Sequence, residues 1–143
     1  MIDDLQVGQV LWLKVRYKID KIAQVKHPML VADIQDDYIE IIALDKTAGK
    51  LQNLYYPYNW YIDSTNLFEK VISEDSYAQF NTKLTIERFP EIVKYRQTRD
   101  KLSHSKLEEL LVNYRDYQNN NLIKEERIVY MTKYEILQLN ENI

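Results

Sequence analysis

Two different hydrophobic periods divide this chain into two parts. Over residues 10–17 apolar and polar side chains alternate, which is the pattern of a strand with one buried face. The expected core face carries Leu11, Leu13, Val15 and Tyr17, and the opposite face carries Trp12, Lys14 and Arg16. Much later, Leu107, Leu110, Leu111, Tyr114 and Tyr117 recur at helical spacing. We therefore expect strands first and helices after them.

Further strands are predicted up to residue 72. The apolar run 29–34 begins just after Pro28, and a turn at 35–37 separates it from a hairpin partner at 39–44. The aromatic stretch 54–62 favours a strand, but Pro57 restricts it to an edge strand or a bent one. Residues 67–72 are expected to close this part. Short, closely spaced strands predict an antiparallel β-barrel over residues 8–72 rather than an open α/β sheet.

The chain beyond residue 73 is predicted to be mainly helical. A short helix is expected at 75–80, and Pro90 suits the first turn of another. Ser105 and Glu108 have the spacing of a capping box ahead of the periodic helix at 106–118. Residues 128–131 favour an edge strand, and Thr132 with Glu135 favours a last short helix. We expect a helical part at 74–118 and a C-terminal extension at 119–143.

Composition limits the class of protein. The 143 residues suit a single domain, and the net charge of −3 argues against a bulk electrostatic nucleic-acid binder, though not against a local cationic groove. The absence of cysteine excludes disulfides, thiol catalysis and Cys-ligated metals. The acidic start resembles no signal peptide, and no stretch approaches the roughly 20 apolar residues of a membrane span. We expect a cytoplasmic protein.

General catalytic motifs are missing from the sequence. The two histidines, His27 and His104, have no metal-site spacing, and there is neither a glycine-rich phosphate loop nor a nucleophile elbow. Adjacent acidic pairs such as Asp36 and Asp37 diverge in a strand or helix and favour a solvated surface. No metal ion or cofactor is predicted.

Two short segments carry a family resemblance. Gly8-Gln9-Val10-Leu11-Trp12-Leu13 followed by Lys26-His27-Pro28-Met29-Leu30-Val31 resembles the opening of the MazF/PemK family of toxin ribonucleases. In that family a first strand is followed by a loop of about this length, and an Arg-Pro dipeptide opens the apolar second strand. The short apolar strand 41–44 and the segment 67–72 are similar to later strands of the family. The resemblance covers residues 6–118.

The resemblance implies a fold and an activity. The fold is mainly β or α+β, an SH3-like antiparallel β-barrel with C-terminal helices, usually a homodimer. The twelve tyrosines and two tryptophans also favour a homodimer, since large aromatics are common at such contacts. The implied activity is metal-independent endoribonuclease cleavage of single-stranded RNA, in a toxin–antitoxin system with a cognate antitoxin protein as partner.

The catalytic positions depart from the family pattern. His27 stands where relatives have a catalytic arginine, and their threonine corresponds most simply to Asp45, or to Thr47 after a small shift. Histidine titrates near neutrality and transfers protons, so it suits RNA cleavage. It is also a plausible turn residue before proline. The missing arginine favours the alternative of a non-catalytic binding module for a protein or nucleic acid.

The remaining candidate residues precede His27 in the sequence. Arg16 would stabilise the phosphate, while Trp12, Lys14 and Lys26 would bind RNA by stacking and by charge. The face that carries Trp12, Lys14 and Arg16 is equally typical of a dimer interface.

Overall fold

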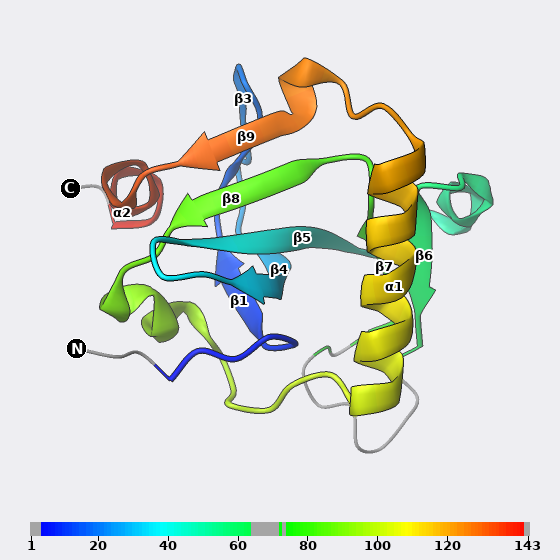
Figure 1. Cartoon of the computed structure of the whole chain (residues 1–143), viewed down its shortest axis with the longest axis horizontal. Helices are drawn as coiled ribbons and strands as arrows, with labels where there is room; N and C mark the ends of the chain where they lie inside the picture. Colours follow the sequence, from blue (N-terminus) through cyan, green and yellow to red (C-terminus); the bar gives the residue numbers. More distant parts are fainter. Residues whose placement is uncertain (1–3, 64–71, 73, 142–143) are drawn as a thin grey trace.

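The computed structural model describes residues 4–63, 72 and 74–141, and it shows a mixed α+β fold. In this part of the chain seven strands form one sheet in the order β1-β4-β5-β7-β6, with β8 paired to β5 and β9 paired to β8 (Figure 1). These strands are β1 (Val10–Leu13), β4 (His27–Ile34), β5 (Tyr38–Lys46), β6 (Asn59–Ile62), β7 (Ser76–Gln79), β8 (Lys83–Glu87) and β9 (Ile128–Met131). A separate hairpin joins β2 (Arg16–Lys18) and β3 (Lys21–Ile22).

Helical elements follow or interrupt the strands. Within the described residues, the α-helices are α1 (His104–Asn120) and α2 (Lys133–Glu141). Three short 3₁₀ helices are η1 (Leu51–Tyr55), η2 (Pro90–Tyr95) and η3 (Glu125–Arg127).

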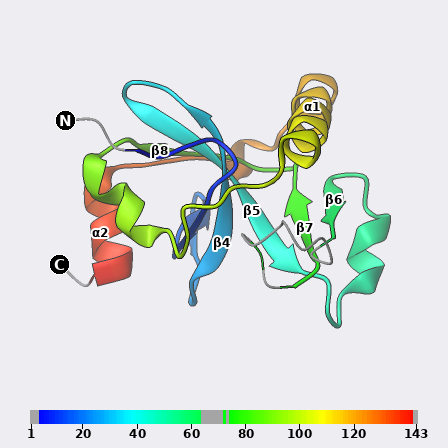
Figure 2. The same ribbon diagram turned by 90° about the horizontal axis from the view of Figure 1, so that it is seen from below.

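Strand β5 organises the sheet because it pairs with three strands. Antiparallel β4 runs along one edge, while the other edge pairs first with β8 through residues 38–41 and then with β7 through residues 44–46. Figure 2 shows the long β5 leaving its hairpin and ending beside β7, with β6 and η1 beyond it. The N-terminal half of β5 thus pairs with β8, and its C-terminal end pairs with β7.

Alternate residues of β4 and β5 enter two separate cores. Met29, Val31, Ile39 and Ile41 belong to the core that also takes in η2, β9 and α2. Leu30, Ala32, Ile42 and Leu44 belong to the other core, together with β7 and α1. The central strands are therefore apolar on both faces, which explains the continuous apolar runs in their sequences.

A buried polar contact docks α1 on the sheet. Glu40 of β5 is buried, and Tyr114 donates its hydroxyl hydrogen to Glu40 Oε2 at 2.6 Å. Arg115 Nη1 donates to Glu40 Oε1 at 2.7 Å. Burial and the neighbouring Glu40 carboxylate raise the pKa of Tyr114, so its hydroxyl stays a hydrogen-bond donor.

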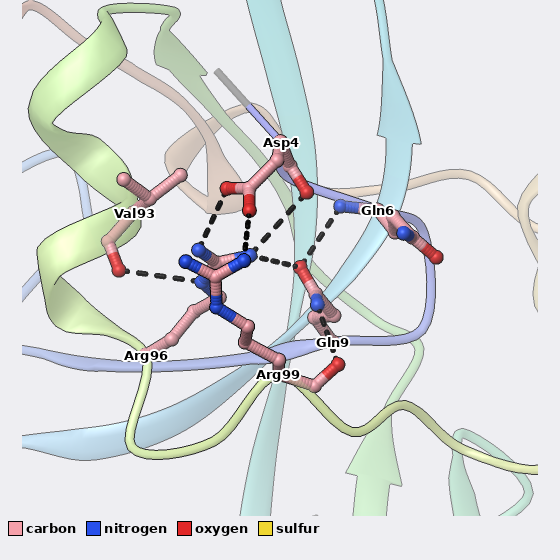
Figure 3. Close-up of polar contacts among 6 residues, drawn as sticks. All are labelled: Asp4, Gln6, Gln9, Val93, Arg96 and Arg99. Atoms are coloured by element: carbon pink, nitrogen blue, oxygen red, sulfur yellow. Dashed lines mark hydrogen bonds and ion pairs between the residues drawn. The ribbon is translucent and has the colours of Figure 1, made fainter.

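The N-terminal segment is held by a second polar cluster, shown in Figure 3. Arg96, whose side chain is only 7% exposed, donates from Nη2 to Asp4 Oδ1 at 2.7 Å and from Nη1 to Gln9 Oε1 at 3.0 Å. Arg99 Nη1 donates to Asp4 Oδ2 at 2.8 Å, and its backbone carbonyl accepts a hydrogen bond from the buried Gln9 side chain at 2.8 Å. We call Asp4, Gln9, Arg96 and Arg99 the N-terminal cluster.

Several sequence predictions are confirmed. The strands at 29–34 and 39–44 lie within β4 and β5, and the helix at 106–118 lies within α1. The edge strand at 128–131 is β9. The last helix is α2, where Glu135 N donates to Thr132 Oγ1 at 3.2 Å.

Other predictions are wrong. Residues 75–80 contain strand β7 instead of a helix, because Tyr77 and Ala78 are buried between β5 and β6. The part at 74–118 thus holds strands β7 and β8 before α1, so the sheet extends past residue 72. Helix α1 begins at His104, which places Ser105 and Glu108 inside it rather than in a capping box. Tyr17 was expected in the core but is 39% exposed. The predicted strand at 67–72 lies outside the described residues except for Ile72.

The segment 119–143 was predicted to be an extension, but its described part belongs to the sheet and core. Strand β9 pairs in parallel with β8, and Val129, Met131 and Ile136 are buried with β1, β4 and β5. Parallel pairing between strands far apart in sequence leaves no local pattern, so the place of this segment in the sheet and core could not be predicted.

Candidate functional site

His27 and Asp45 lie on neighbouring strands at the same end of the sheet. His27 is the first residue of β4, and Asp45 is the next-to-last residue of β5. The antiparallel β4–β5 register ends at Met29 and Ala43, two residues from His27 and from Asp45. A histidine and a carboxylate predicted from separate parts of the sequence thus lie at the same end of the sheet and line the same cavities.

Two cavities share this pair. The first, which we call the large cavity, has a volume of about 510 Å³ and is lined on one side by the β2–β3 hairpin. The second, the small cavity, has a volume of about 320 Å³. Val25, His27 and Asp45 line both cavities and so form the wall between them. Both volumes are within or near the range of small-molecule and substrate sites.

Asp45 is held in place by three donors. Its Oδ2 accepts hydrogen bonds from Lys50 Nζ at 2.8 Å and from the Tyr77 hydroxyl at 3.2 Å. Its Oδ1 accepts one from the Lys46 backbone N–H at 2.9 Å. The hydrogen bond to Asp45 raises the pKa of Lys50, which keeps this lysine a cation at the edge of the small cavity.

The surroundings of the His27 ring differ from those of Asp45. The described residues form no hydrogen bond with this ring, which lines both cavities and is partly buried. An imidazole that is free in this way can accept or donate a proton at either nitrogen. The site thus combines an imidazole without a hydrogen bond to the described residues and a carboxylate that contacts Lys50 and Tyr77.

Cationic side chains outnumber acidic ones around the two cavities. Among the described lining residues, Lys18 and Arg127 belong to the large cavity, and Lys26, Lys46 and Lys50 to the small one. The acidic lining residues are Asp45 and Glu74. This local excess contrasts with the net charge of −3 for the whole chain. A concave, cationic surface suits an anionic ligand.

The predicted site residues separate into two groups. Trp12, Lys26, His27 and Asp45 all line the small cavity. Arg16, Lys14 and Thr47 line neither cavity. Thr47 is buried, and its hydroxyl donates to the Asp75 carbonyl oxygen at 3.4 Å.

Arg16 and Lys14 instead contact the C-terminal helix. Arg16 pairs with Glu135 of α2 at 3.2 Å and donates to the Tyr130 carbonyl oxygen at 3.1 Å. The backbone N–H of Lys14 donates to Asn140 Oδ1 at 2.7 Å. These contacts hold α2 against β1 and the β2–β3 hairpin.

Sequence reasoning missed Lys50, Tyr77 and Arg127. Lys50 lies in the loop after β5, where the fold turns it back toward Asp45. Tyr77 falls in the predicted helix at 75–80, so nothing in the sequence indicated that its hydroxyl would contact Asp45. Arg127 lines the large cavity from η3, far from His27 in sequence. No local motif marks any of the three.

A comparison of the chain with models of protein families found no match, and a comparison with curated proteins found none either. Within residues 4–63, 72 and 74–141 there is no group of three or more side chains suited to holding a metal ion. In the same part of the chain, no helix combines the length and the apolar character needed to cross a membrane.

Proposed function

We propose that this chain binds single-stranded RNA in the large and small cavities and cleaves it without a metal ion. The observation that carries the proposal is the position of His27, free of hydrogen bonds with the described residues, on the wall between two cavities whose charged lining residues are mostly cations. A single strand exposes both its phosphates and its 2′-hydroxyls to such a surface.

The reaction needs few groups. His27 takes the proton of the 2′-hydroxyl, and the 2′ oxygen then forms a bond to phosphorus while the bond to the 5′ oxygen breaks. The leaving oxygen takes a proton from the imidazolium or from water, which gives a 2′,3′-cyclic phosphate and a 5′-hydroxyl end. Lys50 and Lys26 lie where they can stabilise the negative charge that develops on the phosphate oxygens. Because Arg16 lines neither cavity, the proposal assigns phosphate stabilisation to these lysines.

The resemblance to the MazF/PemK family extends the proposal. It adds an SH3-like barrel, a cytoplasmic toxin–antitoxin system, an antitoxin protein as partner and a homodimer. Exposed apolar side chains at Ile19, Ile22 and Tyr130 give the β2–β3 hairpin and β9 a surface suited to a dimer contact. Sedimentation equilibrium at micromolar concentration is expected to give the mass of a dimer, and a monomer mass would contradict this part.

The test of the activity uses the other histidine as its control. Purified protein is incubated with a long single-stranded RNA in the presence of a chelator, and the cleavage ends are mapped. General acid–base catalysis contributes about 10²–10⁴-fold, so His27→Ala should slow cleavage on that scale. His104→Ala removes a side chain that is 94% exposed on α1 and should leave the rate unchanged. Equal rates for the two variants, with intact thermal stability, would overturn the catalytic role of His27.

One observation favours a second function, a binding module without catalysis. Among the described residues, His27 and Asp45 are the two with an imidazole or a carboxyl group that line the large cavity and also the small one. Asp45 already accepts three hydrogen bonds, which leaves His27 as the one of the two that is free to transfer protons. RNA that binds but stays intact in the assay above would select this function.

A further inference from the structure

A third cavity lies beside the large one and is lined almost entirely by polar side chains. Its volume is about 170 Å³. We call it the amide cavity, and its described lining residues are Asn53, Tyr56, Tyr58, Asn59, Tyr77, Gln79, Asn81 and Arg127. Gln79 and Arg127 also line the large cavity, so the two cavities adjoin.

The sheet register brings the amide groups together. Asn59 of β6 is paired directly with Gln79 of β7, and Asn81 follows two residues after Gln79. Tyr56 and Tyr58 stand nearby with their rings stacked, at 5.3 Å between centroids and an interplanar angle of 10°. Flat aromatic and amide groups thus surround one small space.

Several of the polar groups in this cavity have no partner within the described part of the chain. Asn59 Oδ1 is buried and accepts no hydrogen bond there, although Asn59 Nδ2 donates to the Asn53 carbonyl oxygen at 2.9 Å. The side chains of Gln79, Asn81 and Arg127 likewise form no hydrogen bond or ion pair with described residues. A buried polar atom such as Asn59 Oδ1 nearly always has a partner in a folded protein. Gln79, Asn81 and Arg127 are partly exposed where they line the cavity, so their hydrogen-bonding groups are available to a ligand.

The amide cavity is also connected to the proposed cleavage site. Asn53 Nδ2 donates to the Tyr77 hydroxyl oxygen at 3.0 Å, and that hydroxyl donates to Asp45 Oδ2 at 3.2 Å. Asn53 and Tyr77 line the amide cavity, whereas Asp45 lines the large and small cavities. A group bound in the amide cavity would lie next to the wall that carries His27.

We propose that the amide cavity receives one nucleobase of the RNA and determines which base is accepted. Its volume is below the roughly 300 Å³ of pockets for drug-sized ligands, which suits a single flat ring. Side-chain amides carry both donors and acceptors, as the edge of a base requires, and tyrosine rings stack on bases. Arg127 binds the phosphate between this base and the scissile bond. The inference rests on the RNA binding proposed above.

The experiment measures binding, so it does not depend on cleavage. Fluorescence anisotropy in a chelator gives the Kd of labelled ten-nucleotide oligo(U), oligo(C) and oligo(A) for the parent chain and its variants. The parent is expected to prefer one of the three. The Gln79→Ala/Asn81→Ala double variant should bind the preferred oligomer about tenfold more weakly and lose the preference. Gln52→Ala, an exposed glutamine of η1 that does not line the cavity, is the control.

Arg127 gives the complementary result. Arg127→Ala should weaken binding of all three oligomers by a similar factor and reduce the slope of log Kd against log salt by about one, as expected for a phosphate contact. Lys124→Ala removes an exposed cation just before η3 and should change neither quantity.

The outcomes separate this inference from the proposed function. If the parent binds RNA but shows no preference, the proposal that the amide cavity selects a base is wrong while RNA binding stands. The same follows if the double variant keeps the parent's preference and affinity. If the parent binds none of the oligomers, both proposals fail. Thermal unfolding of each variant confirms that a change in Kd does not come from a loss of fold.

Discussion

The N-terminal cluster and the amide cavity are both rich in polar side chains, yet they use them in opposite ways. In the N-terminal cluster Arg96, Asp4 and Gln9 are joined by hydrogen bonds to one another (Figure 3). In the amide cavity the side chains of Gln79 and Arg127 have no partner among the described residues.

The difference separates polar groups that support the fold from polar groups that can serve a ligand. A polar group that contributes to the fold gains its free energy from a partner in the same chain, whereas a group for a ligand keeps its hydrogen-bonding capacity free. Substitutions in the N-terminal cluster should therefore lower stability and spare RNA binding. Substitutions in the amide cavity should do the reverse.

The largest effect on stability is expected at Arg96. Arg96→Ala removes the buried guanidinium with its hydrogen bonds to Asp4 and Gln9, and it also removes the packing of its alkyl stem. We expect a loss of about 2–3 kcal/mol in the free energy of unfolding, measured by urea denaturation. Arg99→Ala is the matched control, because its side chain is 81% exposed and its pair with Asp4 contributes little. Equal losses for the two variants would show that the burial of Arg96 does not determine how much the N-terminal cluster stabilises the fold.

A second loss of stability is expected when Gly8, the neighbour of Gln9, is replaced. Gly8 has a φ of +96°, and a Cβ atom there would lie 2.8 Å from Leu107 Cδ2 of α1. Gly8→Ala should cost about 2 kcal/mol through strain and crowding. Gly49→Ala also meets a positive φ, +75°, but no atom lies within 4 Å, so its cost should be smaller. Thermal unfolding compares the two, and a larger loss for Gly49→Ala would contradict the close packing of the N-terminal segment on α1.

The N-terminal cluster should also respond to pH. The hydrogen bond from Arg96 holds the pKa of Asp4 below its ordinary value of 3.8. A lowered pKa means that the folded state holds the proton less tightly than the unfolded state. The stabilisation is then complete above pH 3.8 and is lost as the pH falls through the folded-state pKa. The difference in Tm between the parent and Asp4→Asn should be present at pH 7 and shrink below pH 3.8. A difference that stays constant down to pH 2 would contradict the pairing.

The smallest effect on stability is expected in the amide cavity. Gln79→Ala and Asn81→Ala remove side chains without partners among the described residues, so each should change the free energy of unfolding by at most about 0.5 kcal/mol. Urea denaturation measures this directly. A loss of 2 kcal/mol or more would show that these residues stabilise the fold, which would contradict a role in ligand binding.

Local periodicity was enough to predict some elements but not others. Strands β4 and β5 and helix α1 are long enough for their apolar patterns to be recognised. Strand β7 has four residues, and Tyr77 and Ala78 at its centre are both buried, so it shows no alternation. The role of β9 depends on parallel pairing with β8, a long-range contact that no local pattern records.

The candidate site, like the fold, was predictable from the sequence only in part. Trp12, Lys26 and His27 lie close to one another in the sequence or on paired strands, and the β1–β4 ladder brings them to one cavity. Lys50 and Arg127 reach the cavities from a loop and from η3, whose positions follow from tertiary packing alone. Arg16 was expected beside His27, but Glu135 of α2, a residue distant in sequence, holds it elsewhere.

A titration of the ¹⁵N-labelled protein with a ten-nucleotide single-stranded RNA, followed by NMR, tests the central contrast most directly. The account predicts that shifts concentrate at His27, Asp45, Gln79, Asn81 and Arg127, with the Asn and Gln side-chain amides of the cavity among the largest. The amides of Gln9, Arg96 and Arg99 should not move. Shifts centred on the N-terminal cluster, or no shifts at millimolar RNA, would contradict it.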